Sequence, residues 1–325
     1  MSTSVGSGGR LLQAVDAPLT RSATFLVLAA KPGQDALDTI RSTLSGVEGL
    51  AKNVSIRDLS ASFNCTIGIG SNIWDALTKL SRPAELHPLP VLKGSVHATV
   101  STPGDLLFHI RSNRRDICFE FERQLLGQLG PSVEVVDSTV GFRYFDARDL
   151  LGFVDGTANP VGADALDAAI VTDDKGSSTS NGGSYVVVQK YLHNLATWSA
   201  LKTEDQESII GRTKLDNVEL DDAPAGQQRS HKTLTTVEDE ATGGEHGIVR
   251  DNMPFGSPAS GEYGTYFIGY SKKLWVVERM LEHMFVGDPP GKHDRILDFS
   301  TAVTGSTFFV PSVEVLGGLA GLVGE

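Results

Sequence analysis

The chain has 325 residues, of which 40% are hydrophobic and 21% charged, and its formal net charge at pH 7 is −12. This composition is typical of a globular protein with one large domain or two of ordinary size. The negative charge disfavours nucleic acid and anionic membranes as partners, and no apolar run approaches the roughly 18 residues that would cross a bilayer.

The first half of the chain alternates short apolar strands with amphipathic helices. The predicted strands are residues 24–30, 62–69, 106–110 and 133–136. The predicted helices contain Leu37 to Val47, Trp74 to Leu80, and Ile117 to Leu129, the last closed by Gly130-Pro131. This order indicates a split β-α-β arrangement.

The second half repeats the plan more loosely. It has predicted strands at 185–188, 263–270 and 308–310, helical stretches through Leu201 and Ile210, and a helix over 274–284. We predict two α+β domains, at residues 21–143 and 144–315, with a flexible segment at 1–20 and a C-terminal tail at 316–325. The β-branched runs disfavour an all-helical bundle.

Two polar segments carry little periodic structure, and the N-terminus and the cysteines indicate the compartment. Residues 172–184 are rich in Gly and Ser and predict a mobile surface loop. Residues 214–252 are long, polar and poor in periodicity, which favours a functional segment. The N-terminus lacks the apolar core of a secretion signal, and Cys65 and Cys118 are isolated, so we expect a cytoplasmic protein.

The most informative segment is GFVDGTANP, residues 152–160. Taken locally, Asp155-Gly156 and Asn159-Pro160 predict two turns. A phosphatase-like Asp-Gly-Thr would need a nucleophilic Asp two residues before Asp155, where this chain has Phe153. A dinucleotide fingerprint is also excluded, because no G-x-G-x-x-G follows a strand.

The same segment resembles the G-x-x-D-G signature of the dye-decolourising (DyP-type) peroxidases. Further pieces are similar to the family in the same order: IGRTKLDNVEL at 210–220, RSHKTL around His231, IVRDNMPFG at 248–256, and GTYFIG at 264–269. The resemblance spans residues 20–315, and the short length favours the type B branch.

The resemblance implies an α+β fold of two ferredoxin-like domains, of the dimeric α+β barrel type, with one haem b per chain in the C-terminal domain. No C-x-x-C-H motif is present, so the haem would be bound non-covalently. His231 is implied as the axial ligand of the haem iron, whereas the other seven histidines are expected to be surface or core residues. A carboxylate on the second ring nitrogen would raise the basicity of His231. Asp216 and Glu219 are near in sequence, and nothing singles out either.

The family places three catalytic residues on the opposite face of the haem, and these map to Asp155, Arg250 and Asn252. A carboxylate can move the peroxide proton, directly or through a water. A permanent cation can stabilise the developing negative charge, and an amide can orient peroxide or water without changing charge. The alternative for Arg250 is a surface position or a pairing with a haem propionate.

Five further residues are implied to contact the cofactor. Arg212 is a candidate for a propionate, because Arg pairs well with carboxylates. The others are expected to line the pocket: Gly156, Thr157, Thr265 and Phe267. For Thr265 and Phe267 the alternative is packing in the core of a strand.

The implied function is oxidation of organic substrates such as dyes and phenols by hydrogen peroxide, through a ferryl intermediate. The alternative is a haem-handling protein, acting in porphyrinogen oxidation or iron release, with incidental peroxidase activity. Asp155, Arg250 and Asn252 favour the enzyme, because a carrier needs none of them. Some type B members bind manganese with a Glu at the position of Ala158. Glu245 alone is a weak site for a divalent ion, so efficient manganese oxidation is not expected.

Type B relatives commonly form homo-oligomers, and we predict the same here. Some relatives enter an encapsulin shell through a C-terminal tail. In this chain only residues 312–325 follow Pro311 and no long flexible linker is present, so the sequence does not support encapsulation.

Overall fold

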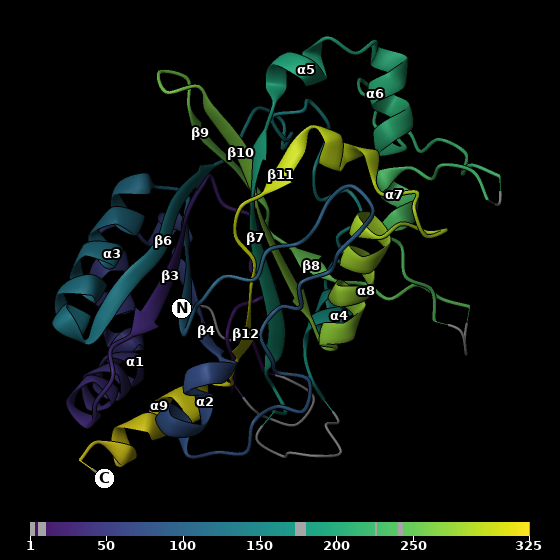
Figure 1. Ribbon diagram of the computed structural model, residues 1–325. Helices are drawn as coiled ribbons and strands as arrows, with labels where there is room; N and C mark the ends of the chain where they lie inside the picture. The colour runs from purple at the N-terminus through teal and green to yellow at the C-terminus, as the bar shows by residue number, and fades with distance from the viewer. Residues whose placement is uncertain (1–3, 6–10, 173–179, 225, 240–242, 325) are drawn as a thin grey trace.

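The computed structural model describes residues 4–5, 11–172, 180–224, 226–239 and 243–324. Its main feature is a 10-stranded antiparallel sheet (Figure 1). The strand order is β6-β3-β5-β4-β12-β7-β10-β8, with β11 and β9 paired to β7 and β10. A short separate pair is formed by β1 (Ser4–Val5) and β2 (Leu11–Leu12).

The N-terminal half of the sheet has a ferredoxin-like order, β6-β3-β5-β4. Its strands are β3 (Ser22–Ala30), β4 (Asn64–Gly70), β5 (Leu106–Ser112) and β6 (Val133–Phe142). Its helices are α1 (Gln34–Ser55), η1 (Leu59–Ala61), α2 (Ser71–Thr78), α3 (Arg115–Leu129) and η2 (Gly130–Ser132). The predicted strands and helices of this half are therefore confirmed. The β6 strand is longer than expected, and α2 ends before Leu80 because Lys79 adopts a left-handed conformation.

The C-terminal half repeats the same order as β12-β7-β10-β8. Its strands are β7 (Ser184–His193), β8 (Val249–Arg250), β9 (Met253–Ser257), β10 (Glu262–Ser271), β11 (Ser300–Ala302) and β12 (Ser306–Val310). Its helices are α4 (Ala163–Ala169), α5 (Leu195–Ser199), α6 (Thr203–Ile210), α7 (His231–Leu234), α8 (Leu274–Phe285), η3 (Arg295–Asp298), α9 (Val313–Gly318) and η4 (Leu319–Leu322). Pairing of β12 with β4 joins the halves into one sheet. This is the predicted α+β arrangement of two ferredoxin-like units.

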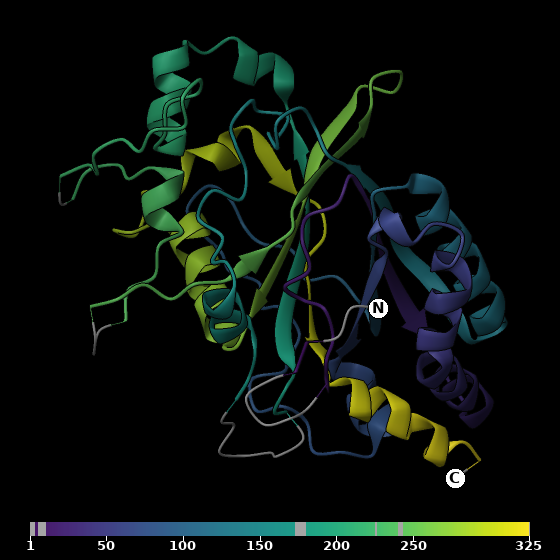
Figure 2. The same cartoon turned by 180° about the vertical axis from the view of Figure 1, so that it is seen from behind.

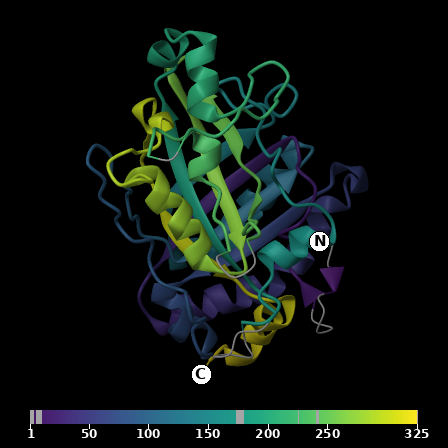
Figure 3. The same cartoon turned by 90° about the vertical axis from the view of Figure 1, so that its right-hand side faces the viewer.

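The two halves of the sheet pack against each other through their inner faces, and helices cover the outer faces. The Phe25 ring of β3 stacks on the Tyr266 ring of β10 with centroids 4.1 Å apart. Helices α1 and α3 lie outside the N-terminal half, and α8 lies outside the C-terminal half (Figures 1 and 3). Burial of Ile40, Leu44 and Val47 gives α1 the apolar face that its sequence predicts.

Residues 12–15 of the N-terminal segment are buried in the fold. Gln13 is buried. Its amide exchanges hydrogen bonds with the backbone of Ile67 and donates to the carbonyl oxygen of Pro311, so it connects β4 to the end of β12. In Figure 2 this purple segment runs beside the strands of both halves. Residues 12–15, within the predicted flexible segment 1–20, are buried. Hydrogen bonds of the Gln13 side chain and of the Ala14 carbonyl oxygen hold them in place.

The C-terminal segment also belongs to the fold. Arg41 of α1 is fully buried and donates to the carbonyl oxygen of Leu322 at 2.8 Å. Leu316 and Leu319 of the predicted tail are buried as well. This end of the chain is held against α1.

The two polar segments of the sequence analysis, 172–184 and 214–252, each include residues outside the described ranges. Residues 173–179 of the predicted loop 172–184 lie outside the described residues, as do 225 and 240–242 of the polar segment 214–252. That polar segment contributes α7 and all of β8. None of the helices within the described ranges is long and apolar enough to span a membrane.

Candidate active site

A cavity of about 870 Å³ lies at the outer face of the C-terminal half of the sheet, between strands β7 and β10 and helices α7 and α8. Its volume is within the range of cofactor and ligand pockets. All the residues that the sequence analysis assigned to the site line this cavity: Asp155, Gly156, Thr157, Arg212, His231, Arg250, Asn252, Thr265 and Phe267. The structure thus brings together residues that are up to 112 positions apart, from Asp155 to Phe267.

One wall of the cavity is apolar. Helix α8 presents Val277, Met280, Leu281 and Met284 to it, a spacing that places these side chains on one helical face. Strand β10 adds Phe267, whose ring passes so close to Gly269 that a Cβ atom there would lie 2.8 Å from it. Glycine is therefore needed for the ring to take this position. The wall suits a large apolar ligand.

His231 is held in the cavity by a buried carboxylate. It begins α7, and its Nδ1 lies 2.6 Å from Oδ2 of Asp294, which is fully buried. Burial lowers the pKa of His231, but the charge of Asp294 and its hydrogen bond outweigh that effect and raise the pKa. Because Nδ1 is engaged with Asp294, the ring orientation is fixed and Nε2 is the ring nitrogen that could bind a ligand.

The carboxylate partner of His231 is neither residue considered from the sequence. Asp216 is exposed, and Glu219 forms an ion pair with Arg212. Asp294 lies 63 residues after His231, and no local pattern points to it. The pairing is formed by the tertiary fold alone.

The GFVDGTANP segment holds the other polar residues in place. Gly156 has a φ of 82°, which favours glycine, and its carbonyl oxygen accepts from the Asn159 amide in the turn predicted there. The Asn159 side chain accepts from the Arg250 amide at 3.1 Å and donates to the Arg250 carbonyl at 2.6 Å. Asn252 Nδ2 donates to Asp155 Oδ2 at 3.1 Å, and Asn252 Oδ1 accepts from the Ile268 amide at 3.0 Å. The motif therefore connects all three polar residues.

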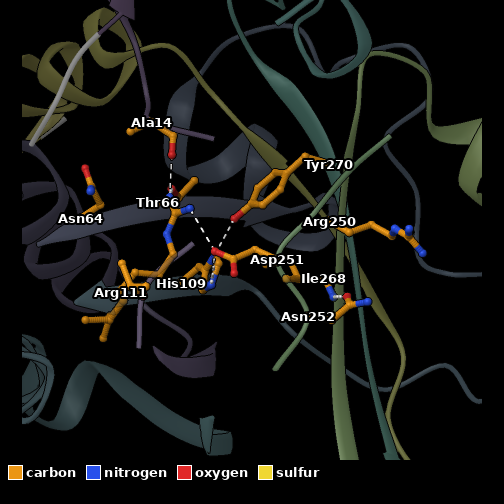
Figure 4. Close-up of polar contacts among 12 residues, drawn as sticks. Ala14, Asn64, Thr66, His109, Arg111, Arg250, Asp251, Asn252, Ile268 and Tyr270 are labelled. Atoms are coloured by element: carbon orange, nitrogen blue, oxygen red, sulfur yellow. Dashed lines mark hydrogen bonds and ion pairs between the residues drawn. The ribbon is translucent and has the colours of Figure 1, made fainter. Parts of the chain in front are cut away.

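Arg250, the last residue of β8, and Asn252 line the cavity, whereas Asp251 between them is buried away from it. Figure 4 shows Asp251 directed at Arg111, with the two atoms Nη1 and Oδ2 3.2 Å apart. Arg111 is fully buried and also donates to Thr66 Oγ1 and to the carbonyl of Ala14. This ion pair fixes the strand of the C-terminal half to the N-terminal half.

The residue beside the pair is uncharged. His109 is fully buried, and its Nδ1 lies 2.9 Å from the Tyr270 hydroxyl. Burial and the charge of Arg111 lower the pKa of His109 well below its usual value. His109 is therefore neutral, and Arg111 and Asp251 balance each other.

Two predicted contact residues are engaged with protein groups. Arg212 pairs with Glu219 and also donates to the Asn217 carbonyl at 3.2 Å. Thr265 Oγ1 lies 2.8 Å from Nε2 of His193, whose pKa burial lowers to about 4. His193 also lines the cavity and was not expected there.

A second, smaller pocket of about 40 Å³ adjoins Asp155, Arg250 and Asn252. Other lining residues of this pocket come from the segments around Thr20 and Tyr144 and from the start of β9. This volume suits a molecule about the size of water. The three polar side chains therefore contact both the large cavity and a small one.

Comparisons with known proteins show which family the chain belongs to. The family descriptions "Dyp-type peroxidase, N-terminal" and "Dyp-type peroxidase, C-terminal" match residues 13–143 and 146–315. The chain belongs to the Dyp-type peroxidase family. It is 50% identical over 311 residues to the dye-decolorizing peroxidase of Brevibacterium linens, covering 95% of this chain and 82% of that protein.

Solved structures of the same family superpose closely. DyPB from Rhodococcus jostii RHA1 is 53% identical, with a TM-score of 0.89, covering 94% of this chain and 97% of that one. A variant of that protein in complex with heme gives a TM-score of 0.90 at 52% identity, with the same coverage. The encapsulated DyP-type peroxidase from Mycobacterium smegmatis gives 0.88 at 49% identity, covering 94% and 97%. The DypB neighbours indicate type B.

We predict that loss of the Arg111–Asp251 ion pair lowers the free energy of unfolding strongly. Replacing Asp251 with Ala leaves the Arg111 charge buried without its partner, so the free energy of unfolding should fall by about 3 to 5 kcal/mol. The double variant Asp251→Leu, Arg111→Met should recover most of this loss. Urea unfolding of the three proteins measures it. A single variant as stable as the parent would show that the pair does not hold the two halves together.

Asp149, at the cavity wall, predicts a pH dependence of stability. Burial raises the pKa of Asp149 to about 7, although the Phe153 amide donates to its carboxylate at 2.9 Å. The folded state then binds the proton more tightly than the unfolded state, so stability should fall as pH rises from about 4 to about 7. The loss is at most about 1.4 kcal/mol per pH unit. It should be absent in Asp149→Asn, and equal pH slopes of the unfolding free energy in both proteins would contradict it.

Proposed function

We propose that this protein is a haem b peroxidase that uses hydrogen peroxide to oxidise small organic substrates such as dyes and phenols. The observation that carries the proposal is a single cavity that holds both the His231–Asp294 pair and the polar set Asp155, Arg250 and Asn252. Relatives with about half of their residues identical over most of the chain are named dye-decolorizing peroxidases. One solved relative is described in complex with heme.

The residues of the cavity fit a haem. The apolar wall of α8 suits the macrocycle, and a neutral imidazole backed by a carboxylate is a common ligand of its iron. Arg212, Arg229 and Lys232 also line the cavity and offer cations to the propionates. His231 would thus bind the iron through Nε2. When bound, haem accepts the oxidising equivalents of peroxide and passes them to the reductant.

Asp155, Arg250 and Asn252 can transfer the peroxide proton and stabilise the negative charge that develops on oxygen. Asp155 accepts a proton from peroxide, or from a water that it orients, and later returns it to the departing oxygen. Asn252 holds the Asp155 carboxylate by its hydrogen bond of 3.1 Å. Arg250 contributes a permanent charge that stabilises the negative oxygen as the O–O bond breaks. The clamp of Asn159 on the Arg250 backbone fixes where that charge lies.

The haem-handling alternative is not favoured. Binding and release of haem would need only the apolar wall and His231, so a haem carrier would not require the connected residues Asp155, Arg250 and Asn252. Manganese is a poor substrate in our proposal. Ala158 has no ligand atom, and Glu245, although it also lines the cavity, is exposed and offers one carboxylate.

We further propose a cytoplasmic homo-oligomer. Strand β6 lies at one end of the sheet order, and Val135, Val136, Val140 and Phe142 on it are each at least 37% exposed. Apolar residues along an edge strand favour self-association. One relative is described as encapsulated, but the C-terminal residues 313–324 of this chain are engaged in α9, η4 and their contacts with α1. Encapsulation is therefore not part of the proposal.

Self-association is tested by light scattering. The expected mass is a multiple of the 34.6 kDa chain. Lys or Glu in place of Val136 and Val140 should reduce it, because a charge on the exposed face of β6 opposes burial. A parent protein that elutes with the mass of one chain would contradict the proposal.

His231→Ala should lose most of its haem. The variant removes the proposed iron ligand, and the cavity has no covalent attachment to compensate for it. Haem content per chain and the Soret spectrum measure the loss. His246→Ala, at another histidine of the cavity, serves as the matched control and should retain its haem. Normal loading and an unchanged ligand spectrum in His231→Ala would refute the assignment.

Arg250 should matter more than Asp155 for the reaction with peroxide. Loss of a charge that acts on the developing oxyanion costs roughly 10²- to 10³-fold in rate, whereas water can replace part of the proton transfer by Asp155. The measurement is the second-order rate of the Soret change after mixing with peroxide, in Arg250→Leu, Asp155→Ala and the parent at equal haem content. Arg123→Leu is the control, because Arg123 is an exposed arginine of α3 that pairs with Glu120 and does not line the cavity. The prediction fails if Arg250→Leu reacts like the parent while Asp155→Ala is slow at every pH.

A further inference from the structure

A group of metal-ligating side chains lies outside the cavity. His97, His293 and Asp298 each offer one ligand atom, and these atoms all lie within 4.8 Å of one another. None of the three lines the cavity described above. The group joins the long connection between α2 and β5 to the segment between α8 and β11.

The three side chains already place their ligand atoms close together, as a metal site with three protein ligands would. Nε2 of His97 and Nε2 of His293 each lie 2.9 Å from the same oxygen, Oδ1 of Asp298. The two rings are nearly perpendicular, with an interplanar angle of 73° and centroids 4.8 Å apart. Ligand atoms around a tetrahedral zinc ion, with bonds near 2.0 to 2.2 Å, lie about 3.3 to 3.5 Å apart. Small side-chain shifts would therefore admit an ion.

The backbone around the group is constrained. The turn before His97 is closed by a hydrogen bond of 2.9 Å from the Gly94 amide to the His97 carbonyl. A Cβ atom on Gly94 would lie 1.8 Å from the Phe285 carbonyl oxygen, so this turn is packed directly on the end of α8. The His293 carbonyl accepts from Gln228, and Asp298 ends η3. The ligands thus come from fixed segments.

The exposure and charge of the group leave room for an ion. The side chains of His97, His293 and Asp298 are 27%, 15% and 41% exposed, so one side is open to solvent. Two imidazoles and one carboxylate suit Zn²⁺ and related ions, whereas Mg²⁺ prefers oxygen ligands alone.

We propose that His97, His293 and Asp298 bind one divalent cation of the zinc class, with solvent completing its coordination. The ion would fasten the connection that carries His97 to the segment that carries Asp294, the residue next to His293 and the partner of His231. This site is separate from the haem iron, and it stands or falls independently of the peroxidase proposal.

The test is a calorimetric titration of ZnCl₂ into tag-free, chelator-treated, haem-loaded protein. We expect one saturable ion per chain, a rise in the midpoint of thermal unfolding, and no binding of MgCl₂. His97→Ala and Asp298→Asn should each weaken zinc binding at least about 10-fold. His87→Ala is the matched control, because His87 is an exposed histidine of the same connection that pairs with Glu278 instead.

Three results would overturn the proposal. They are the absence of saturable zinc uptake by the parent, uptake of unchanged affinity in both His97→Ala and Asp298→Asn, and a change of the Soret band in step with uptake, which would place the ion in the cavity. The thermal midpoint and the calorimetry do not depend on peroxidase activity, so failure of one proposal is distinguishable from failure of the other.

Discussion

The buried ion pair between Arg111 and Asp251 is the interaction on which the site depends. Arg250 ends strand β8, and the next residue, Asp251, is fixed between the halves of the sheet, while Arg250 and Asn252 on either side of it line the cavity. A slip of one residue would reverse this and bury Arg250 instead. Arg111 cannot move to another partner without losing further hydrogen bonds, because it also donates to Thr66 Oγ1 and to the Ala14 carbonyl oxygen.

The cavity combines a rigid polar part with an apolar part, and each comes from a different kind of element. The polar groups lie on short strands and loops that are held by side-chain hydrogen bonds, such as those of Asn159 to Arg250. The apolar wall comes from one face of α8. His231 stands in a four-residue helix, and Asp294 holds it from a separate segment. A cofactor bound without covalent attachment needs such preorganised contacts to be both retained and oriented.

Much of the fold could be predicted from the sequence, because its long elements carry strong periodic patterns. The apolar run at 24–30 and the spacing of Ile40, Leu44 and Val47 each became the predicted element. The two-residue β8 could not be predicted, since two residues carry no period. For the site, motif resemblance selected residues that all line one cavity, and their individual roles stay predictions. Asp294 and Asn159 were missed as positioning groups, because their partners lie 63 and 91 residues away.

The central claim is that one cavity holds an iron through His231 while Asp155, Arg250 and Asn252 act on peroxide. An experimental structure of the haem-loaded protein tests it most directly. We predict that Nε2 of His231 would bind the iron, that Nδ1 would keep its hydrogen bond to Asp294, and that Asp155, Arg250 and Asn252 would line the place where peroxide binds. Iron bound by His193 or His246, or polar side chains directed only at the propionates, would contradict it.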